Sequence, residues 1–162
     1  MKAAIITISD SGYQGKRKDE SGPIICDMLK NYGYEIIETY ILPDDRTSIS
    51  EKLREIADKG DINLILTTGG TGFSERDCTP EATADIMEKD APGIAEAIRM
   101  HSMQITKRAM LSRAKSVIRG KTLIINLPGS PKAVRESLEY ILPELQHGLE
   151  IMVGTASECS RK

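Results

Sequence analysis

Apolar residues follow two alternating spacings along this chain, one typical of buried strands and the other typical of helices. Residues Lys2–Ser9 form an almost continuous apolar run, which is the pattern of a strand buried on both faces of a sheet. Further strands are predicted at Glu35–Leu42, Asn63–Thr68, Ala114–Arg119 and Thr122–Leu127. A sheet of several strands is therefore expected.

Apolar residues at helical spacing occupy the segments between these strands. Ser21 is expected to cap a helix that has Pro23 in its first turn, and Gly33 ends this helix. Further helices are expected at Ser48–Lys59, from the cap Thr79-Pro80-Glu81, after Asp90–Gly93, after Pro128–Pro131, and from about Pro143 to near Gly154. Strands that alternate with helices form βαβ units. We therefore predict one α/β domain over residues 1–162, with three layers: a mainly parallel sheet and helices on both of its faces.

Four loops with unusual residues follow the predicted strands. They are Ser9-Asp10-Ser11, Pro43-Asp44-Asp45, Thr68-Gly69-Gly70-Thr71-Gly72 and Pro128-Gly129-Ser130. In parallel α/β sheets, ligands bind at the carboxyl ends of the strands. We therefore expect these loops to lie together and to form the binding site.

The segment Thr68–Gly72 contains three glycines with hydroxyl residues between them. Glycine permits positive φ angles and lets backbone N–H groups approach a ligand, and successive amides in such a turn form an anion-binding concavity. A tight turn without a ligand is the alternative. Lys115 replaces the first glycine of a Walker A loop ending at Gly120-Lys121-Thr122, and Glu75 replaces the last glycine of a G-x-G-x-x-G motif counted from Gly70. An anion site outside both standard nucleotide motifs is predicted.

Two aspartates follow predicted strands close to this turn. Asp77 lies just after the glycines, and a carboxylate beside a phosphate site repels the ligand unless a cation lies between them. Asp44 ends a neighbouring strand and could supply a second oxygen ligand to Mg²⁺. The alternatives are a helix-capping role for Asp77 and an ordinary turn for Asp44. Similarly, Ser130 could only cap its helix, or the helix N-terminus could hold a second anionic group.

The composition of the chain argues against several classes of function. The net charge of −2 argues against a nucleic-acid binder, and the short basic cluster Lys16-Arg17-Lys18 is interpreted as a solvated loop. Three separated cysteines, Cys26, Cys78 and Cys159, indicate a reduced cytoplasmic protein, and neither a signal peptide nor a membrane span is expected. His101 and His147 are isolated, and Cys78 has no paired base, so no nucleophilic triad is predicted.

The run from Thr67 to Thr83, TTGGTGFSERDCTPEAT, resembles the signature of the MogA/MoaB molybdenum cofactor biosynthesis family, which includes the gephyrin G domains. Further similar motifs, in the same order, are Ile8-Ser9-Asp10, Asp19 with Ser21-Gly22-Pro23, Pro43-Asp44, Pro92-Gly93, Ala109–Arg113 and Leu127–Pro131. The resemblance covers almost the whole chain. It implies a MogA-like fold assembled as a homotrimer or hexamer.

The resemblance also implies a reaction, in which Mg²⁺-ATP and molybdopterin give adenylylated molybdopterin and pyrophosphate. It places the two functional aspartates on Asp44 and Asp77, which would also bind Mg²⁺. It places nucleotide and pterin contacts on Ser9, Asp10, Ser11, Thr68, Gly69, Gly70, Thr71, Gly72, Ser112, Arg113, Pro128, Gly129 and Ser130. A partner protein for molybdenum insertion is a further implication. A non-catalytic molybdopterin- or nucleotide-binding protein and a trimeric scaffold are the alternatives.

Overall fold

The computed structural model describes residues 1–155 and contains one six-stranded sheet, in the strand order β2-β1-β3-β6-β5-β4. Four neighbouring strands are parallel: β2 (Glu35–Leu42), β1 (Lys2–Ile8), β3 (Leu64–Thr68) and β6 (Thr122–Leu127). The strands β5 (Ser116–Arg119) and β4 (Lys89–Asp90) extend the sheet in antiparallel pairing. The prediction of a mainly parallel sheet is confirmed, and only the two-residue strand β4 has no counterpart in the sequence prediction.

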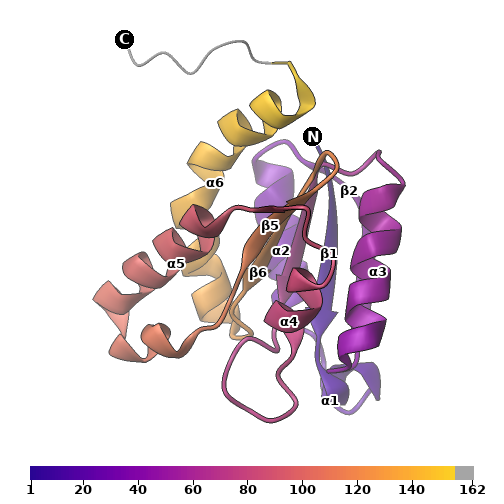
Figure 1. The fold of residues 1–162 in the computed structure, drawn as a ribbon. Coiled ribbons are helices and arrows are strands. Elements are labelled where there is room, and N and C mark those ends of the chain that lie inside the picture. Colours follow the sequence, from indigo (N-terminus) through magenta and orange to yellow (C-terminus); the bar gives the residue numbers. More distant parts are fainter. Residues whose placement is uncertain (156–162) are drawn as a thin grey trace.

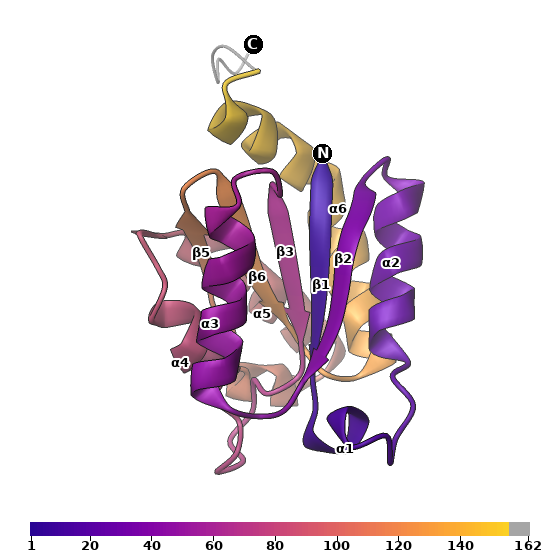
Figure 2. The same cartoon turned by 90° about the vertical axis from the view of Figure 1, so that its right-hand side faces the viewer.

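Helices cover both faces of this sheet, so the three-layer α/β prediction is also confirmed (Figures 1 and 2). One face packs against α2 (Ser21–Asn31), α5 (Pro92–Ile105) and α6 (Pro131–Val153). The other face packs against α3 (Arg46–Asp58) and α4 (Thr79–Ala84). Residues of β1 alternate between the two cores, with Ala3 and Ile5 on the first face and Ala4 and Ile6 on the second.

Two short helices lie outside these layers. The helix α1 (Asp10–Tyr13) follows β1 in a segment expected to be a loop, because the Ser9 hydroxyl accepts a hydrogen bond from the Gly12 amide at 3.1 Å and caps one turn. The 3₁₀ helix η1 (Lys107–Leu111) follows α5. No helix among residues 1–155 has the length and apolar character that a membrane crossing requires.

Three sequence predictions about helix ends are wrong. Pro143 begins no new helix, because α6 runs through it and keeps Leu142, Leu145 and Leu149 buried in one core. Ser21 does not cap α2, since the Asp19 carboxylate accepts from the first amides of that helix. Thr79 does not cap α4, because its hydroxyl donates to the Gly69 carbonyl at 3.0 Å. That bond ties α4 to the glycine turn.

Candidate active site

The carboxyl ends of the parallel strands meet at one edge of the sheet, below the strands in Figure 2, and the predicted loops meet there too. The Thr68 hydroxyl donates to the Pro128 carbonyl at 2.7 Å, which joins the loop after β3 to the loop after β6. The Ser21 hydroxyl donates to the Gly129 carbonyl at 3.0 Å, which joins the latter loop to the start of α2. These bonds hold segments that are distant in sequence in one place.

Glycine is required at two positions of the turn for steric reasons. Gly69 has φ +99°, and a Cβ there would lie 2.3 Å from the Ile8 carbonyl oxygen. Gly70 has φ +64°, and a Cβ there would lie 2.3 Å from the Thr79 hydroxyl oxygen. An L side chain at either position would combine an unfavourable backbone conformation with a collision. The backbone of this turn is therefore packed directly against β1 and α4.

The turn uses its carbonyl groups within the protein and leaves its amides free. The carbonyls of Gly69 and Gly70 accept from the hydroxyl and the amide of Thr79, and those of Thr71 and Gly72 accept from the amide and Nε of Arg113. Within residues 1–155, the amides of Gly70, Thr71 and Gly72 donate no hydrogen bond. Three consecutive free N–H groups are what an anion-binding turn requires.

Two cavities flank the turn, and together they contain most of the predicted contact residues. The first has a volume of about 300 Å³, and its lining includes Ser9, Thr68, Gly69, Gly129 and Ser130 together with Arg17, Lys18 and Ser21. The second is also about 300 Å³ and is lined by Thr71, Gly72, Ser112 and Pro128, with Arg99 and Arg108. The glycine turn is thus shared by two hollows, which suits a site for two ligands or for one long ligand.

Ser130 has the capping role that the sequence allowed. Its hydroxyl accepts from the Ala133 amide at 3.2 Å at the start of α6, and Pro131 occupies the first turn. Ser130 also lines the first cavity, so the start of α6 faces the same space as Gly69. The capping and ligand-binding interpretations of this serine are therefore compatible.

Asp10 and Asp44 bind each other's backbone. The Asp10 amide donates to Oδ2 of Asp44 at 2.9 Å, and the Asp44 amide donates to Oδ1 of Asp10 at 3.0 Å. Arg76 then pairs with the Asp10 carboxylate through Nε at 3.0 Å and Nη2 at 3.1 Å. Asp10 thus joins the loops after β1 and β2 to the loop that contains Asp77. Ser11, its neighbour, lies with its hydroxyl 3.2 Å from that of Ser9.

The electrostatics of the two carboxylates differ. The hydrogen bonds from Arg76 lower the pKa of Asp10, and the Asp44 amide lowers it further. Burial raises the pKa of Asp44, and the charges of Asp10 and Asp77 raise it further, against the opposing effect of the hydrogen bond from the Asp10 amide. Asp44 is therefore a partly buried carboxylate in a region of negative charge. Arg76 offsets part of that charge, and the sequence analysis did not single it out, because nothing in the local pattern shows its partner.

Asp77 is oriented by its own loop. Its Oδ2 accepts from the Ser74 amide at 3.1 Å, and this oxygen would lie 2.9 Å from a Cβ at Gly72. Asp77 makes no hydrogen bond to the amides of α4, so the capping alternative does not describe it. Its second carboxylate oxygen accepts no hydrogen bond within the described chain. The carboxylate therefore has one oxygen available beside the glycine turn.

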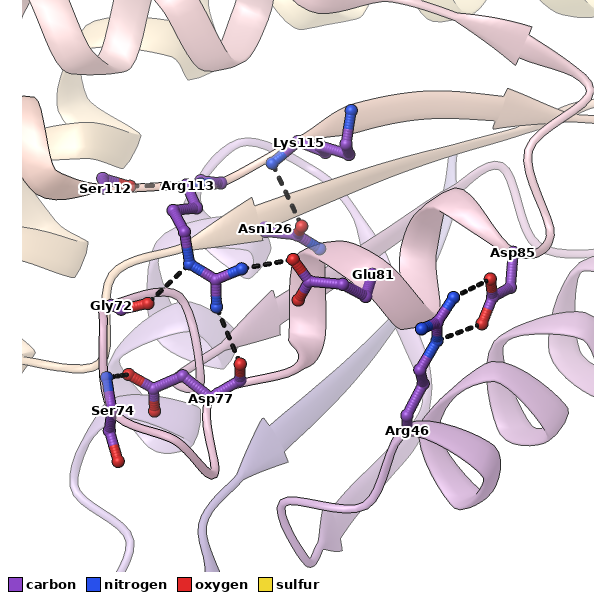
Figure 3. A network of polar contacts seen from close by, with 11 residues as sticks. Arg46, Gly72, Ser74, Asp77, Glu81, Asp85, Ser112, Arg113, Lys115 and Asn126 are labelled. Carbon is purple, nitrogen blue, oxygen red and sulfur yellow. Dashed lines mark hydrogen bonds and ion pairs between the residues drawn. The ribbon is translucent and has the colours of Figure 1, made fainter.

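The Arg113 guanidinium holds this loop from inside, as Figure 3 shows. Its Nε donates to the Gly72 carbonyl at 2.7 Å, its Nη2 donates to the Asp77 carbonyl at 2.7 Å, and its Nη1 pairs with the Glu81 carboxylate. The structure thus gives Arg113 a role in positioning the segment from Gly72 to Asp77. A direct contact of Arg113 with substrate stays a prediction.

His101 and Cys78, which were not expected to act as nucleophiles, have structural contacts instead. His101 stacks on Tyr140 with ring centroids 4.3 Å apart, between α5 and α6. Burial raises the pKa of the Cys78 thiol, which keeps it protonated and unreactive. Residues 1–155 contain no group of three or more His, Cys, Asp or Glu side chains that could hold a metal ion by themselves. A divalent cation here would need oxygen ligands from the substrate as well.

Comparisons with known proteins agree with this geometry. Residues 4–147 match the family described as "Probable molybdopterin binding domain". The chain is 38% identical to a molybdopterin adenylyltransferase of Helicobacter pylori over 160 residues, which are 98% of this chain and 91% of that protein. It is 41% identical to the Drosophila melanogaster molybdenum cofactor synthesis protein cinnamon over 91% of this chain but only 25% of that longer protein.

Solved structures show the same relationship. The crystal structure of the molybdopterin biosynthesis enzyme MoaB from Thermus thermophilus superimposes with a TM-score of 0.89 at 43% identity, and the alignment covers 94% of this chain and 96% of that one. The predicted resemblance to the MogA/MoaB proteins is confirmed by sequence and by fold. This chain therefore belongs to the molybdopterin-binding domain family of molybdenum cofactor biosynthesis.

Proposed function

We propose that this protein is a molybdopterin adenylyltransferase that transfers AMP from Mg²⁺-ATP to molybdopterin and releases pyrophosphate. The observation that carries the proposal is the glycine turn, whose carbonyls are bound by the protein while the amides of Gly70, Thr71 and Gly72 remain free. The relatives named molybdopterin adenylyltransferase, matched over most of this chain, support the same reaction.

The residues fit a bound Mg²⁺ ion. Asp44 and Asp77 each retain one carboxylate oxygen without a hydrogen bond in the described part of the chain, and both lie against the glycine turn. Burial, and then the neighbouring carboxylates, raise the pKa of Asp44. A bound cation would lower this pKa by stabilising the ionised carboxylate. Mg²⁺ usually binds through one or two carboxylates, waters and substrate phosphates. When bound, it would neutralise phosphate charge.

The protein's own residues position the substrates. The terminal phosphate of molybdopterin attacks the α-phosphorus of ATP, the bond from that phosphorus to the bridging oxygen breaks, and pyrophosphate leaves. No Ser, Cys or His nucleophile is needed, in agreement with the raised pKa of the Cys78 thiol, which burial causes, and with the stacking of His101 on Tyr140. Free amides hold the phosphate oxygens in place, and such pre-positioned donors stabilise charge in the transition state. The two cavities, which share the glycine turn, support a site that binds two reactants.

Assembly into a homotrimer or hexamer is part of the proposal. Large apolar side chains are exposed at the end of α5 and in η1: Met100 is 65% exposed, Met110 58%, Ile105 50% and Leu111 47%. A cluster of this kind on a protein surface marks an interface. We also propose a cytoplasmic location, supported by Cys26 and Cys78, which are free thiols on opposite faces of the sheet. Cys159 lies outside the described residues. A partner protein for molybdenum insertion stays a prediction.

The test measures pyrophosphate release from ATP by the pure protein, with and without molybdopterin. We expect release that requires both molybdopterin and Mg²⁺, and we expect Asp77→Asn to reduce it by at least tenfold. Asp61→Asn is the matched control, because Asp61 is exposed at the opposite end of the sheet from the glycine turn. Binding of both ligands without molybdopterin-dependent release would instead establish a non-catalytic carrier or scaffold.

A further inference from the structure

A basic pair lines the first cavity beside the glycine turn. Arg17 and Lys18 belong to the cluster interpreted from sequence as a solvated loop, and both also line this cavity of about 300 Å³ together with Gly69 and Ser130. Both side chains are exposed, and neither forms an ion pair within residues 1–155. Unpaired cations on the wall of a cavity that also presents helix-start and glycine-turn backbone are suited to an anionic ligand.

The backbone on each side of this pair is held in place. The amides of Lys16 and Arg17 donate to the Ser11 carbonyl at 2.9 and 3.2 Å, which fixes the start of this segment, including the Arg17 backbone, to α1. After the pair, the Asp19 carboxylate accepts from the amides of Ser21 and Gly22, at 3.0 Å each. The two cations therefore belong to a short segment whose backbone is anchored at both ends beside the cavity.

Two acids share the same wall and must be accounted for. Asp19 accepts from two α2 amides and from the Thr7 hydroxyl at 2.7 Å, so its oxygens are occupied by the protein's own donors. Glu20 is exposed, makes no hydrogen bond or ion pair in the part of the chain described, and lines the cavity beside Lys18. Arg17 and Lys18 are thus the groups free to bind an anion, and Glu20 is the group that would repel one.

We propose that Arg17 and Lys18 bind the outermost phosphate of the substrate that occupies this cavity. Among the residues that line the cavity, those of the strand ends and Gly69 are buried, whereas Arg17 and Lys18 are exposed, so the two cations suit the part of the ligand nearest to solvent. Arginine provides a planar fork of donors and lysine a point charge, and both are common phosphate ligands. Under the proposed function, that phosphate is either the γ-phosphate of ATP or the phosphate of molybdopterin.

The experiment measures equilibrium binding by calorimetry, separately for ATP, AMP and molybdopterin, at two salt concentrations. For the double variant Arg17→Ala/Lys18→Ala we expect roughly tenfold weaker binding of the phosphate ligand at low salt and a smaller loss at high salt, because exposed charges are screened. Weaker ATP binding with unchanged AMP binding assigns the outer phosphates of ATP. Weaker molybdopterin binding with unchanged ATP binding assigns the pterin phosphate.

Two further variants separate contact from net charge. Lys16→Ala removes a neighbouring positive charge that does not line the cavity, and we expect it to change binding by less than about twofold. Glu20→Gln removes the opposing charge, and we expect it to tighten binding by about twofold. An equal loss in Lys16→Ala and in the double variant, or no loss for any ligand, would overturn the inference.

Binding is measured without turnover, so this result is independent of the adenylyl transfer reaction. Weakened ATP binding in a protein that never releases pyrophosphate would leave the role of Arg17 and Lys18 intact and refute only the proposed function. Pyrophosphate release by a double variant with unchanged substrate affinity would leave the proposed function intact and refute the role of Arg17 and Lys18. Since both side chains are exposed, the thermal midpoint of the double variant should equal that of the wild type, which confirms that the variant is folded.

Discussion

Gly69→Ala should destabilise the fold through one identifiable contact. The Cβ added at Gly69 would lie 2.3 Å from the Ile8 carbonyl oxygen, which belongs to the backbone of a central strand and cannot rotate away. The φ angle of +99° adds the unfavourable conformation of an L residue at positive φ. Both costs arise where the carboxyl ends of β1 and β3 meet the candidate site.

The size of the effect follows from these two terms. A positive φ costs an L residue about 1–2 kcal/mol. Forcing an extra methyl group into a packed backbone contact costs about 1–3 kcal/mol. The sum is roughly 2–5 kcal/mol, a large part of the 5–15 kcal/mol that usually stabilises a domain. For a domain of this length, we expect the thermal midpoint to fall by about 4–20 °C.

Urea unfolding of the wild type and three variants tests this reasoning. Gly33→Ala is the matched control, because Gly33 also has a positive φ, +80°, but a Cβ there would have no heavy atom within 4 Å. Gly148→Ala, in the open part of α6, should stabilise the helix by about 0.5–1 kcal/mol. The difference between Gly69→Ala and Gly33→Ala isolates the collision with Ile8, at about 1–3 kcal/mol.

If Gly69→Ala and Gly33→Ala lose the same free energy of unfolding, at unchanged m-value, the contact with Ile8 does not exist or relaxes freely. The claim that the turn is packed directly on β1 would then be refuted. The free amides of Gly70, Thr71 and Gly72 would keep their orientation, because the bonds from Thr79 and Arg113 to the carbonyls of the turn set it.

Three further predictions concern other groups. The hydrogen bonds from Arg76 lower the pKa of Asp10. Their pairing therefore stabilises the fold at pH values above the ordinary aspartate pKa, and this stabilisation is lost as the pH falls through the lower pKa of the folded state. Urea unfolding measured from about pH 7 to pH 2 should show a weaker acid dependence for Arg76→Ala than for the wild type. The Tyr34 hydroxyl is buried without a hydrogen-bond partner in the described chain, and burial raises its pKa to about 12. Tyr34→Phe should therefore be neutral or stabilising by up to about 1–2 kcal/mol, and it should remove the loss of stability that the wild type shows between about pH 10 and pH 12. The lysine of Arg113→Lys cannot make all three contacts of the guanidinium, so the rate constant of pyrophosphate release should fall about 10- to 100-fold with little change in KM. An unchanged rate would show that the positions of Gly72 and Asp77 do not depend on the Arg113 contacts.

The buried strands could be predicted from sequence because their signal is local. A strand buried on both faces is apolar at nearly every position, and Thr122–Leu127 is buried throughout and has the predicted bounds. The edge strand Glu35–Leu42 also has its predicted bounds, although its residues alternate between exposed and half-buried. The break at Pro143 was predicted wrongly for a tertiary reason. Proline removes one helical hydrogen bond, but the apolar stripe of α6 continues past it and stays buried in the core, which outweighs that cost.

The residues at the turns could be predicted, but their partners could not. Glycines and strand-end aspartates are visible in the sequence, because they mark positions where backbone or charge is unusual. The Arg76–Asp10 pair spans 66 residues, and the bond from Arg113 to Gly72 spans 41. Contacts at such separation depend on strand order, which local spacing does not encode.

In the glycine turn, the carbonyl of a peptide group is bound by the protein while the amide of the same group is free for a ligand. Along Gly69–Gly72 the carbonyls are bound by Thr79 and Arg113, which belong to two different parts of the chain. Any rotation of a peptide in this turn would break one of those bonds and point a carbonyl at the ligand, which would repel a phosphate. The outward direction of the amides is therefore enforced before a ligand arrives. Pre-organisation of this kind places the cost of orienting the donors in folding, so that phosphate binding does not have to supply it.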